Sequence, residues 1–126
     1  MKILDNLKYT ENHEWVEINE SIATIGITDY AQKELGDIVY LDVDTVGQNL
    51  DVEAIFGSVE AVKTVSDLYM PVAGKVLELN GNLETNPELL NESPYNKGWI
   101  IKVELDNSIQ NNKLLTSKNY KEHIGL

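Results

Sequence analysis

The chain has 126 residues, a length typical of one domain, and its 21 acidic and 10 basic side chains give a formal net charge of −11. All the basic residues are lysines, so no arginine is present to bind a phosphate with two parallel hydrogen bonds. This charge disfavours nucleic acid and anionic membranes as partners and favours proteins with basic docking surfaces. The absence of cysteine excludes disulfides, thiol catalysis and thiolate metal sites.

The sequence shows neither a targeting segment nor a membrane-spanning segment. Residues 1–6 lack the apolar core of a signal peptide and the arginine-rich character of a transit peptide. No apolar run approaches the roughly 20 residues that a membrane-spanning helix needs. Composition does not shift along the chain and no linker is visible. We therefore expect a cytoplasmic protein with a single domain over residues 1–126.

The N-terminal third predicts a hairpin followed by a short helix. Residues 13–18 and 21–27 are β-like runs, and Asn19-Glu20 between them predicts a tight turn. Asp29 as N-cap and Gly36 as C-terminal stop then bound a helix of one to two turns. So short a helix has little stability of its own, and we expect packing to hold it in place.

The segment after this helix predicts a strand. In residues 38–43, every second side chain is apolar from Val39 onward. We therefore expect Val39, Leu41 and Val43 to share one face of the strand, with Asp42 on the opposite face. A polar loop follows.

The most informative stretch runs from Gly57 to Asp67. Small and β-branched residues lead up to Lys63, similar residues follow it, and neither glycine nor proline stands near the tip. Strand formers on both sides of a short polar apex predict a hairpin with Lys63 near its turn. Gly57, inside the first strand, indicates a bend or the close approach of another backbone.

Lys63 is isolated from other cations. It is the only basic residue between Lys33 and Lys75, an interval that contains eight acidic side chains. An enzyme that modifies lysine would therefore meet one amine in this region and no competing amine. A solvated surface lysine without a special role is the alternative interpretation.

The second half of the chain predicts further strands and short helices. We expect a strand over residues 75–79 and a helix that begins with Asn86 as N-cap and Pro87 as its first residue. Apolar and charged side chains alternate in residues 99–105, which predicts an amphipathic strand. A final short helix is expected over residues 116–123. Many short strands with frequent turns predict a mainly β protein, built as a sandwich or barrel of antiparallel sheets.

No catalytic or metal-binding motif is recognisable in the sequence. His13 and His123 lie far apart, and neither has the spacing of a metal site. A serine elbow, a P-loop and a dinucleotide fingerprint are all absent. We therefore expect no catalytic residues and no metal ligands in this chain.

The lysine hairpin resembles the lipoyl-lysine hairpin of the glycine cleavage system H-protein family, and the resemblance extends over nearly the whole chain. The segments that carry it are residues 13–16, 25–29, 35–39, 56–63, 86–89 and 98–102. The resemblance implies the flattened two-sheet antiparallel architecture of lipoyl and biotinyl carriers, a barrel-sandwich hybrid. Short peripheral helices and a short C-terminal helix are expected additions to it. The sequence departs from the family at Tyr30, Ala61 and Ser93, where histidine, serine and an acid are common, which bears on docking surfaces.

The resemblance also implies site residues. Lys63 is the position at which the family carries lipoate in amide linkage. Glu14 and Asp67 match positions in a cleft into which the loaded arm folds, where a carboxylate would favour the ammonium of the adduct. The alternative interpretation of both acids is that they are solvated surface carboxylates.

The resemblance implies a non-catalytic carrier whose active sites belong to its partners. These partners are glycine decarboxylase (P protein), aminomethyltransferase (T protein), dihydrolipoyl dehydrogenase (L protein) and the enzymes that attach lipoate. The arm would take the aminomethyl group of glycine from the first enzyme to the second and be reoxidised by the third. The protein supplies presentation and recognition, and the prosthetic group supplies the chemistry.

Three other functions are compatible with parts of this pattern. A lipoyl relay that supplies lipoyl groups to 2-oxoacid dehydrogenase complexes would have the same hairpin. A biotin carrier shares the architecture but usually has methionines beside its lysine, where this chain has Val62 and Thr64. An unmodified β interaction domain would require the match over several segments to be coincidental.

Overall fold

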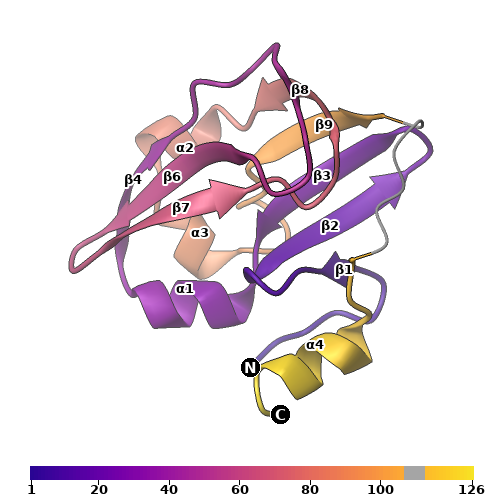
Figure 1. The fold of residues 1–126 in the computed structure, drawn as a ribbon. Helices are drawn as coiled ribbons and strands as arrows, with labels where there is room; N and C mark the ends of the chain where they lie inside the picture. Colours follow the sequence, from indigo (N-terminus) through magenta and orange to yellow (C-terminus); the bar gives the residue numbers. More distant parts are fainter. Residues whose placement is uncertain (107–112) are drawn as a thin grey trace.

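The computed structural model describes residues 1–106 and 113–126, which form two antiparallel sheets and four short helices (Figure 1). The strands are β1 (Lys8–Tyr9), β2 (Glu14–Asn19), β3 (Ile22–Ile27), β4 (Ile38–Asp42), β5 (Asn49–Leu50), β6 (Ile55–Ala61), β7 (Val65–Tyr69), β8 (Gly74–Leu79) and β9 (Ile101–Leu105). The helices are α1 (Asp29–Leu35), α2 (Asn82–Thr85), α3 (Leu89–Glu92) and α4 (Ser117–His123). The large sheet has the order β1-β2-β3-β9-β8-β5, and the small sheet has the order β4-β6-β7. Neither sheet closes on itself. The predicted fold, with two antiparallel sheets and short helices, is confirmed.

The main hydrophobic core joins side chains from both sheets. Ile25 and Val103 come from the large sheet, and Phe56, Val59 and Leu68 come from the small sheet; all five are buried. Alternation along each strand directs these side chains inward while their polar neighbours face solvent. Each fully buried side chain of this size contributes roughly 1.5–3 kcal/mol relative to an exposed one. The two sheets are therefore held together mainly by apolar contact.

The predicted first hairpin and short helix are both present. β2 and β3 pair from Glu14↔Ile27 to Asn19↔Ile22, so the turn residues are Glu20 and Ser21, one position after the predicted Asn19-Glu20. Gly36 ends α1 with a φ of 79°, a conformation that glycine adopts without the penalty of a Cβ. These two elements follow from local sequence alone.

The predicted N-cap of α1 is wrong by one residue. Thr28 has extended backbone angles, and its side-chain oxygen accepts a hydrogen bond from the Ala31 N–H. Asp29 is the first helical residue, where its carboxylate suits the positive end of the helix dipole and accepts from the Gln32 side chain. Threonine and aspartate both cap helices well, so neighbouring candidates are distinguished only by backbone geometry.

β4 departs from the predicted alternation. Leu41 is buried, but Val39 is 48% exposed and Val43 is only half-buried. The pairing of β4 with β6 shifts register between Ile38 and Tyr40, and such an irregularity interrupts the alternation of a strand. As a result Val39 and Tyr40 are both exposed, beside the hairpin formed by β6 and β7.

Gly57 has the predicted close backbone contact. A Cβ at this position would lie 2.5 Å from the carbonyl oxygen of Asp42 and 2.7 Å from a methyl carbon of Val43. The β6–β7 pairing also shifts register between Ile55 and Gly57. Glycine is therefore required where the end of β4 crosses close to β6.

In the second half of the chain, the predicted strand β9 and helix α4 are confirmed, and the predicted start of helix α3 is wrong. β9 buries Ile101 and Val103 as expected, and Thr116 caps α4 through a hydrogen bond from the Asn119 N–H. The helix predicted to begin at residues 86–87 instead begins at Leu89. The N–H groups of Leu89 and Leu90 donate to the carbonyls of residues 86 and 87, so a turn precedes α3.

A second, smaller cluster packs α4 against the N-terminal segment. The rings of Tyr9 and Tyr120 stack with centroids 4.6 Å apart. The Tyr120 hydroxyl lies 2.9 Å from His13 Nδ1 and 2.7 Å from Thr28 Oγ1. His13 and His123, distant in sequence, have ring centroids 5.6 Å apart. Within residues 1–106 and 113–126, no group of three or more His, Asp or Glu side chains is arranged to hold a metal ion.

The helices are short and amphipathic or polar. None of those in the described part of the chain has the length and apolarity needed to cross a membrane.

The buried Thr28 hydroxyl supports both α1 and α4, which generates a stability prediction. Thr28→Val keeps the shape of the side chain but removes the cap of α1 and the contact with Tyr120. We expect a loss of about 1–3 kcal/mol in the free energy of unfolding, measured by urea denaturation. Thr116→Val, which removes the exposed cap of α4, should cost no more than about 1 kcal/mol. Equal losses in the two variants would contradict the structural role given to Thr28.

Candidate functional site

The hairpin of β6 and β7 presents Lys63 at its tip. The Ala61 N–H donates to the Thr64 carbonyl with a distance of 2.8 Å, which closes the turn around Val62 and Lys63. Both of these side chains are exposed, and Val62 is 75% exposed. Figure 1 shows the tip projecting beside the junction of α1 and β4, at the opposite end of the molecule from α4 and both termini.

Two contacts join the tip to the α1–β4 junction. The Val62 N–H donates to the Asp37 carbonyl at 3.0 Å. A Cβ on Gly36 would lie 3.4 Å from Lys63 Cε and 3.7 Å from Lys63 Nζ, so the lysine side chain passes close to the glycine. A Cβ at Gly36 would only make ordinary van der Waals contact with the lysine, so glycine is favoured here by the positive φ that ends α1.

The Lys63 amine is available for chemistry. The ion pairs among the described residues involve Lys33, Lys102 and Lys121, and none of them includes Lys63. An exposed amine without a bound carboxylate can approach an enzyme without first breaking a contact. The sequence-based prediction of a lysine at a hairpin turn agrees with this geometry, while its modification remains a prediction.

The outer face of the small sheet presents a row of polar side chains below the tip. Ser58 on β6 pairs with Asp42 on β4 and with Asp67 on β7, so these three residues lie side by side across the sheet. Glu60 lies in the neighbouring row, between Tyr40 and Val65. Asp67 is exposed and lines a shallow depression of about 190 Å³ that Asp42 also lines.

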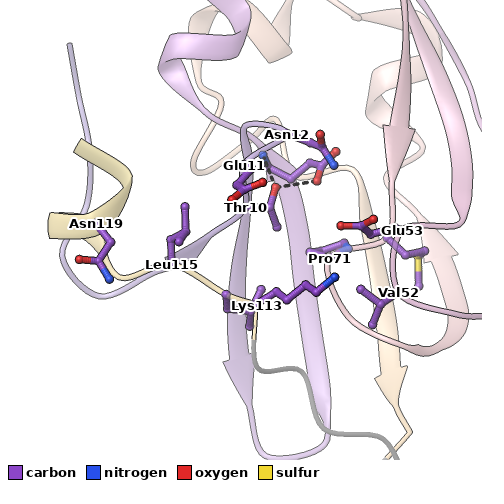
Figure 2. Close-up of a pocket in the computed structure, with 12 residues that line it drawn as sticks. Thr10, Glu11, Asn12, Val52, Glu53, Pro71, Lys113, Leu115 and Asn119 are labelled. Atoms are coloured by element: carbon purple, nitrogen blue, oxygen red, sulfur yellow. Dashed lines mark hydrogen bonds between the residues drawn. The ribbon is translucent and has the colours of Figure 1, made fainter. Parts of the chain in front are cut away.

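Glu14 lines a different and larger pocket, with a volume of about 510 Å³ (Figure 2). Its lining residues come from the β1–β2 turn, the segments before β6 and after β7, and the segment that leads into α4. Figure 2 shows Lys113 extending across this pocket toward Val52, Glu53 and Pro71. The pocket therefore contains groups of both charges.

Glu14 is 2% exposed, and each oxygen of its carboxylate accepts a hydrogen bond. Thr10 Oγ1 donates to Oε1 at 2.8 Å, and the Tyr69 N–H donates to Oε2 at 3.1 Å. Burial raises the pKa of Glu14 from 4.5 to about 7, although both hydrogen bonds act in the opposite direction and Glu53 adds to the increase. At neutral pH the group is thus poised between its neutral and ionised forms, and a cation in the pocket would favour ionisation.

The three predicted site residues lie along one hairpin edge but not in one cavity. Lys63 is at the tip, Asp67 is on β7, and Tyr69 at the end of β7 binds Glu14. Asp67 and Tyr69 are two positions apart, about 7 Å along a strand, and Lys63 lies roughly 20 Å from Tyr69 along the chain direction. Asp67 and Glu14 line separate depressions.

Sequence reasoning missed the residues that support Glu14. Thr10 binds Glu14 across a turn in which His13 has a φ of 68°, and no residue in this turn is a glycine. The Tyr69 N–H comes from a strand that is distant in sequence. The Tyr69 contact has no local sequence signal, because it depends on how the hairpin edge packs against the start of β2. The Thr10 contact is local, but no glycine marks the turn that forms it.

Comparison with known proteins gives a consistent result. Residues 7–125 match the family model described as glycine cleavage H-protein. The crystal structure of a glycine cleavage system H protein from Mycobacterium marinum matches with a TM-score of 0.90 and 32% sequence identity, over 98% of this chain and 100% of that chain. The resemblance inferred from sequence segments is confirmed by both findings.

The buried carboxylate generates a pH prediction. The pKa of Glu14 is higher in the folded protein than in the unfolded chain, so the folded state binds the extra proton between pH 4.5 and about 7. The contribution of Glu14 to stability must therefore fall as pH rises through this window. Glu14→Gln should remove this dependence and gain up to about 3 kcal/mol over the wild type by pH 8, measured by urea unfolding at several pH values.

The matched control is Glu17→Gln, which changes an exposed carboxylate on the same strand. This variant leaves Glu14 in place and should therefore keep the pH dependence that Glu14 causes. Parallel pH profiles for the two variants would show that Glu14 titrates as an ordinary surface acid.

Proposed function

Because the chain belongs to the glycine cleavage H-protein family, we propose that it is a one-domain lipoyl carrier of a glycine cleavage system, with lipoate attached to Lys63. The observation that carries the proposal is the exposed amine at the tip of a hairpin whose base is buried in the core. Family and fold together support a carrier role in glycine cleavage. The attachment site, the individual transfer steps and the partners are our proposals.

The residues present fit an amide-linked lipoyl group. Lys63 is exposed, as an attaching enzyme requires, and its amine takes part in none of the ion pairs among the described residues. When attached, lipoate supplies a dithiolane that receives the aminomethyl group of glycine at glycine decarboxylase, delivers it at aminomethyltransferase and is reoxidised at dihydrolipoyl dehydrogenase. The hairpin contributes a fixed base, from which a flexible arm has a high effective concentration at a docked enzyme.

The Glu14 pocket suits the ammonium of a loaded arm. Glu14 provides a buried carboxylate whose two hydrogen bonds hold it in one orientation. An ammonium beside it would interact strongly in this low-dielectric setting and would draw the carboxyl into its ionised form. Asp67 lies on the hairpin edge between the tip and this pocket, so it would meet the arm along its path. We assign both acids this role as a proposal.

The partners would dock on the acidic outer face of the small sheet. Asp42, Glu60 and Asp67 are exposed there, close to the strand ends that carry Lys63. Partners with basic surfaces would be attracted to this face, and the attraction would act mainly on the rate of encounter. Glu14 is buried and does not contribute to this surface.

Lys63 should be the one residue that accepts lipoate. Incubation with a lipoate-attaching enzyme, lipoate and ATP should add one lipoyl group, which peptide mass mapping should locate at Lys63. Lys63→Arg should fold normally and remain unmodified, because a guanidinium keeps the charge but does not form the amide. Lys75→Arg, a conservative change at another exposed lysine, should be modified as fully as the wild type. Full modification of Lys63→Arg would refute the assignment.

The lipoylated protein should also support glycine chemistry. Addition of glycine decarboxylase and glycine should give exchange between carbon dioxide and the glycine carboxyl group. A lipoylated carrier that is inert in this assay, but donates its lipoyl group to a 2-oxoacid dehydrogenase, would favour the relay function instead.

Docking should depend on salt. The KM of aminomethyltransferase for the loaded carrier should rise as the Debye length shrinks from about 30 Å to about 8 Å. Reversal of Asp42, Glu60 and Asp67 to lysine should flatten this response. The control reverses three exposed acids of the large sheet and its β2–β3 turn (Glu17, Glu20 and Glu104). It makes the same change in net charge and should flatten the salt dependence of KM less. An identical effect of both triple variants would mean that net charge, and not this face, governs docking.

A further inference from the structure

The backbone that supports the lysine tip is itself held by a side chain from a distant element. The Val62 N–H donates to the Asp37 carbonyl at 3.0 Å. The same peptide unit carries the Ile38 N–H, which donates to Asn91 Oδ1 at 3.0 Å. Asn91 belongs to α3, so one planar peptide connects α3 to the hairpin tip.

Asn91 also holds the neighbouring backbone. Its Nδ2 donates to the Gly36 carbonyl at 2.8 Å and to Gln32 Oε1 at 3.1 Å. The side-chain amide therefore uses its acceptor on Ile38 and its donors on α1 and its C-cap. The orientation of the amide follows from its neighbours, because a carbonyl requires a donor and an N–H requires an acceptor. These bonds flank Asp37 on both sides and fix the direction of its carbonyl.

Asn91 is well placed to act as a rigid anchor. Leu90, its neighbour in α3, is fully buried in the main core. A four-residue helix has little stability of its own, so this burial is what sets its position. The tip of the hairpin, by contrast, is exposed and contains no proline to restrict it. Its direction therefore depends on contacts such as the bond from Val62 to Asp37.

We propose that Asn91 is a positioning residue for Lys63: by fixing the Asp37–Ile38 peptide, it sets the direction in which the hairpin tip presents the lysine amine to the attaching enzyme. This inference rests on the proposed lipoylation of Lys63. Reactions between bound groups are sensitive to displacements of about 1 Å, which can cost about a hundredfold in rate. A loosened tip should therefore slow modification even when the protein remains folded.

Asn80 provides a matched control. It is buried, and its side chain also makes three hydrogen bonds, to the carbonyls of Lys97 and Trp99 and from the Asn82 N–H. It follows β8 and makes none of its side-chain bonds to the α1–β4 junction. Asn80→Ala should therefore reduce stability as Asn91→Ala does without disturbing the hairpin tip.

The test measures two quantities in Asn91→Ala, Asn80→Ala and the wild type, under conditions where all are folded. Amide hydrogen exchange at Val62, followed by NMR on the unmodified protein, reports the bond to Asp37. The kinetics of lipoylation report the presentation of Lys63. Asn91→Ala should speed exchange at Val62 about tenfold and lower kcat/KM for lipoylation about tenfold, mainly through kcat. Asn80→Ala should leave kcat/KM for lipoylation unchanged. Its exchange rate at Val62 should change only as far as its lower free energy of global unfolding requires.

If Asn91→Ala does not fold, Asn91→Asp replaces it. This variant keeps an acceptor for the Ile38 N–H and removes the donor to the Gly36 carbonyl, so both effects should appear in reduced size. Equal results for the Asn91 and Asn80 variants would overturn the inference, as would a change in only one of the two quantities. Failure of the wild type to accept lipoate would instead refute the proposed function, and the exchange result would still show whether Asn91 fixes the tip.

Discussion

The structure depends on a hairpin that is rigid at its base and exposed at its tip. Phe56, Val59 and Leu68 fix the base of β6 and β7 in the core between the two sheets. Movement of the base would expose these side chains to water, at a cost of roughly 1.5–3 kcal/mol each. Val62 and Lys63 extend beyond the core and remain in solvent. A carrier requires this combination, because an arm searches for its partners efficiently only from a fixed attachment point.

Charge is distributed differently on the surface and in the interior. The exposed acids of the small sheet lie below the tip and give the protein a surface suited to basic partners. Glu14, by contrast, is the buried acidic residue of the described chain. Burial of a carboxylate is costly unless hydrogen bonds compensate, and here Thr10 and Tyr69 compensate only in part, since the pKa remains raised. A partly compensated ionisable group that lines a cavity is typical of a ligand-binding site.

The tip and the pocket are connected through the edges of the same hairpin. At one end, the α1–β4 junction receives the Val62 N–H and passes close to Lys63. At the other end, the Tyr69 N–H holds Glu14 at the start of β2. The hairpin therefore joins the proposed attachment site to the proposed binding site for the loaded arm. The length of the hairpin sets the distance between the two sites, and its rigidity keeps that distance constant. An arm attached at the tip must span this distance to reach the pocket.

Local patterns in the sequence determined the longer strands, the two hairpins and the exposed lysine. The two-residue strands β1 and β5 were not predicted, and β5 lies in the segment expected to be a polar loop. Alternation and turn residues act over a few positions, so the hairpin with Lys63 near its turn and the close backbone contact at Gly57 were both predictable. Errors at this level were small: Thr28 and not Asp29 caps α1, and the irregular pairing of β4 exposes Val39. Both errors arose where neighbouring residues had similar propensities and only backbone geometry distinguished them.

Tertiary structure alone decided what surrounds these elements. The sequence contains Glu14 as one of many acids, and only the packing of β7 against the start of β2 buries it and raises its pKa. Likewise, the approach of His123 to His13 and the bonds from Asn91 to the α1–β4 junction join segments that are distant in the chain. Such contacts have no local signature, because they depend on the register of the strands and on the packing of both sheets around one core.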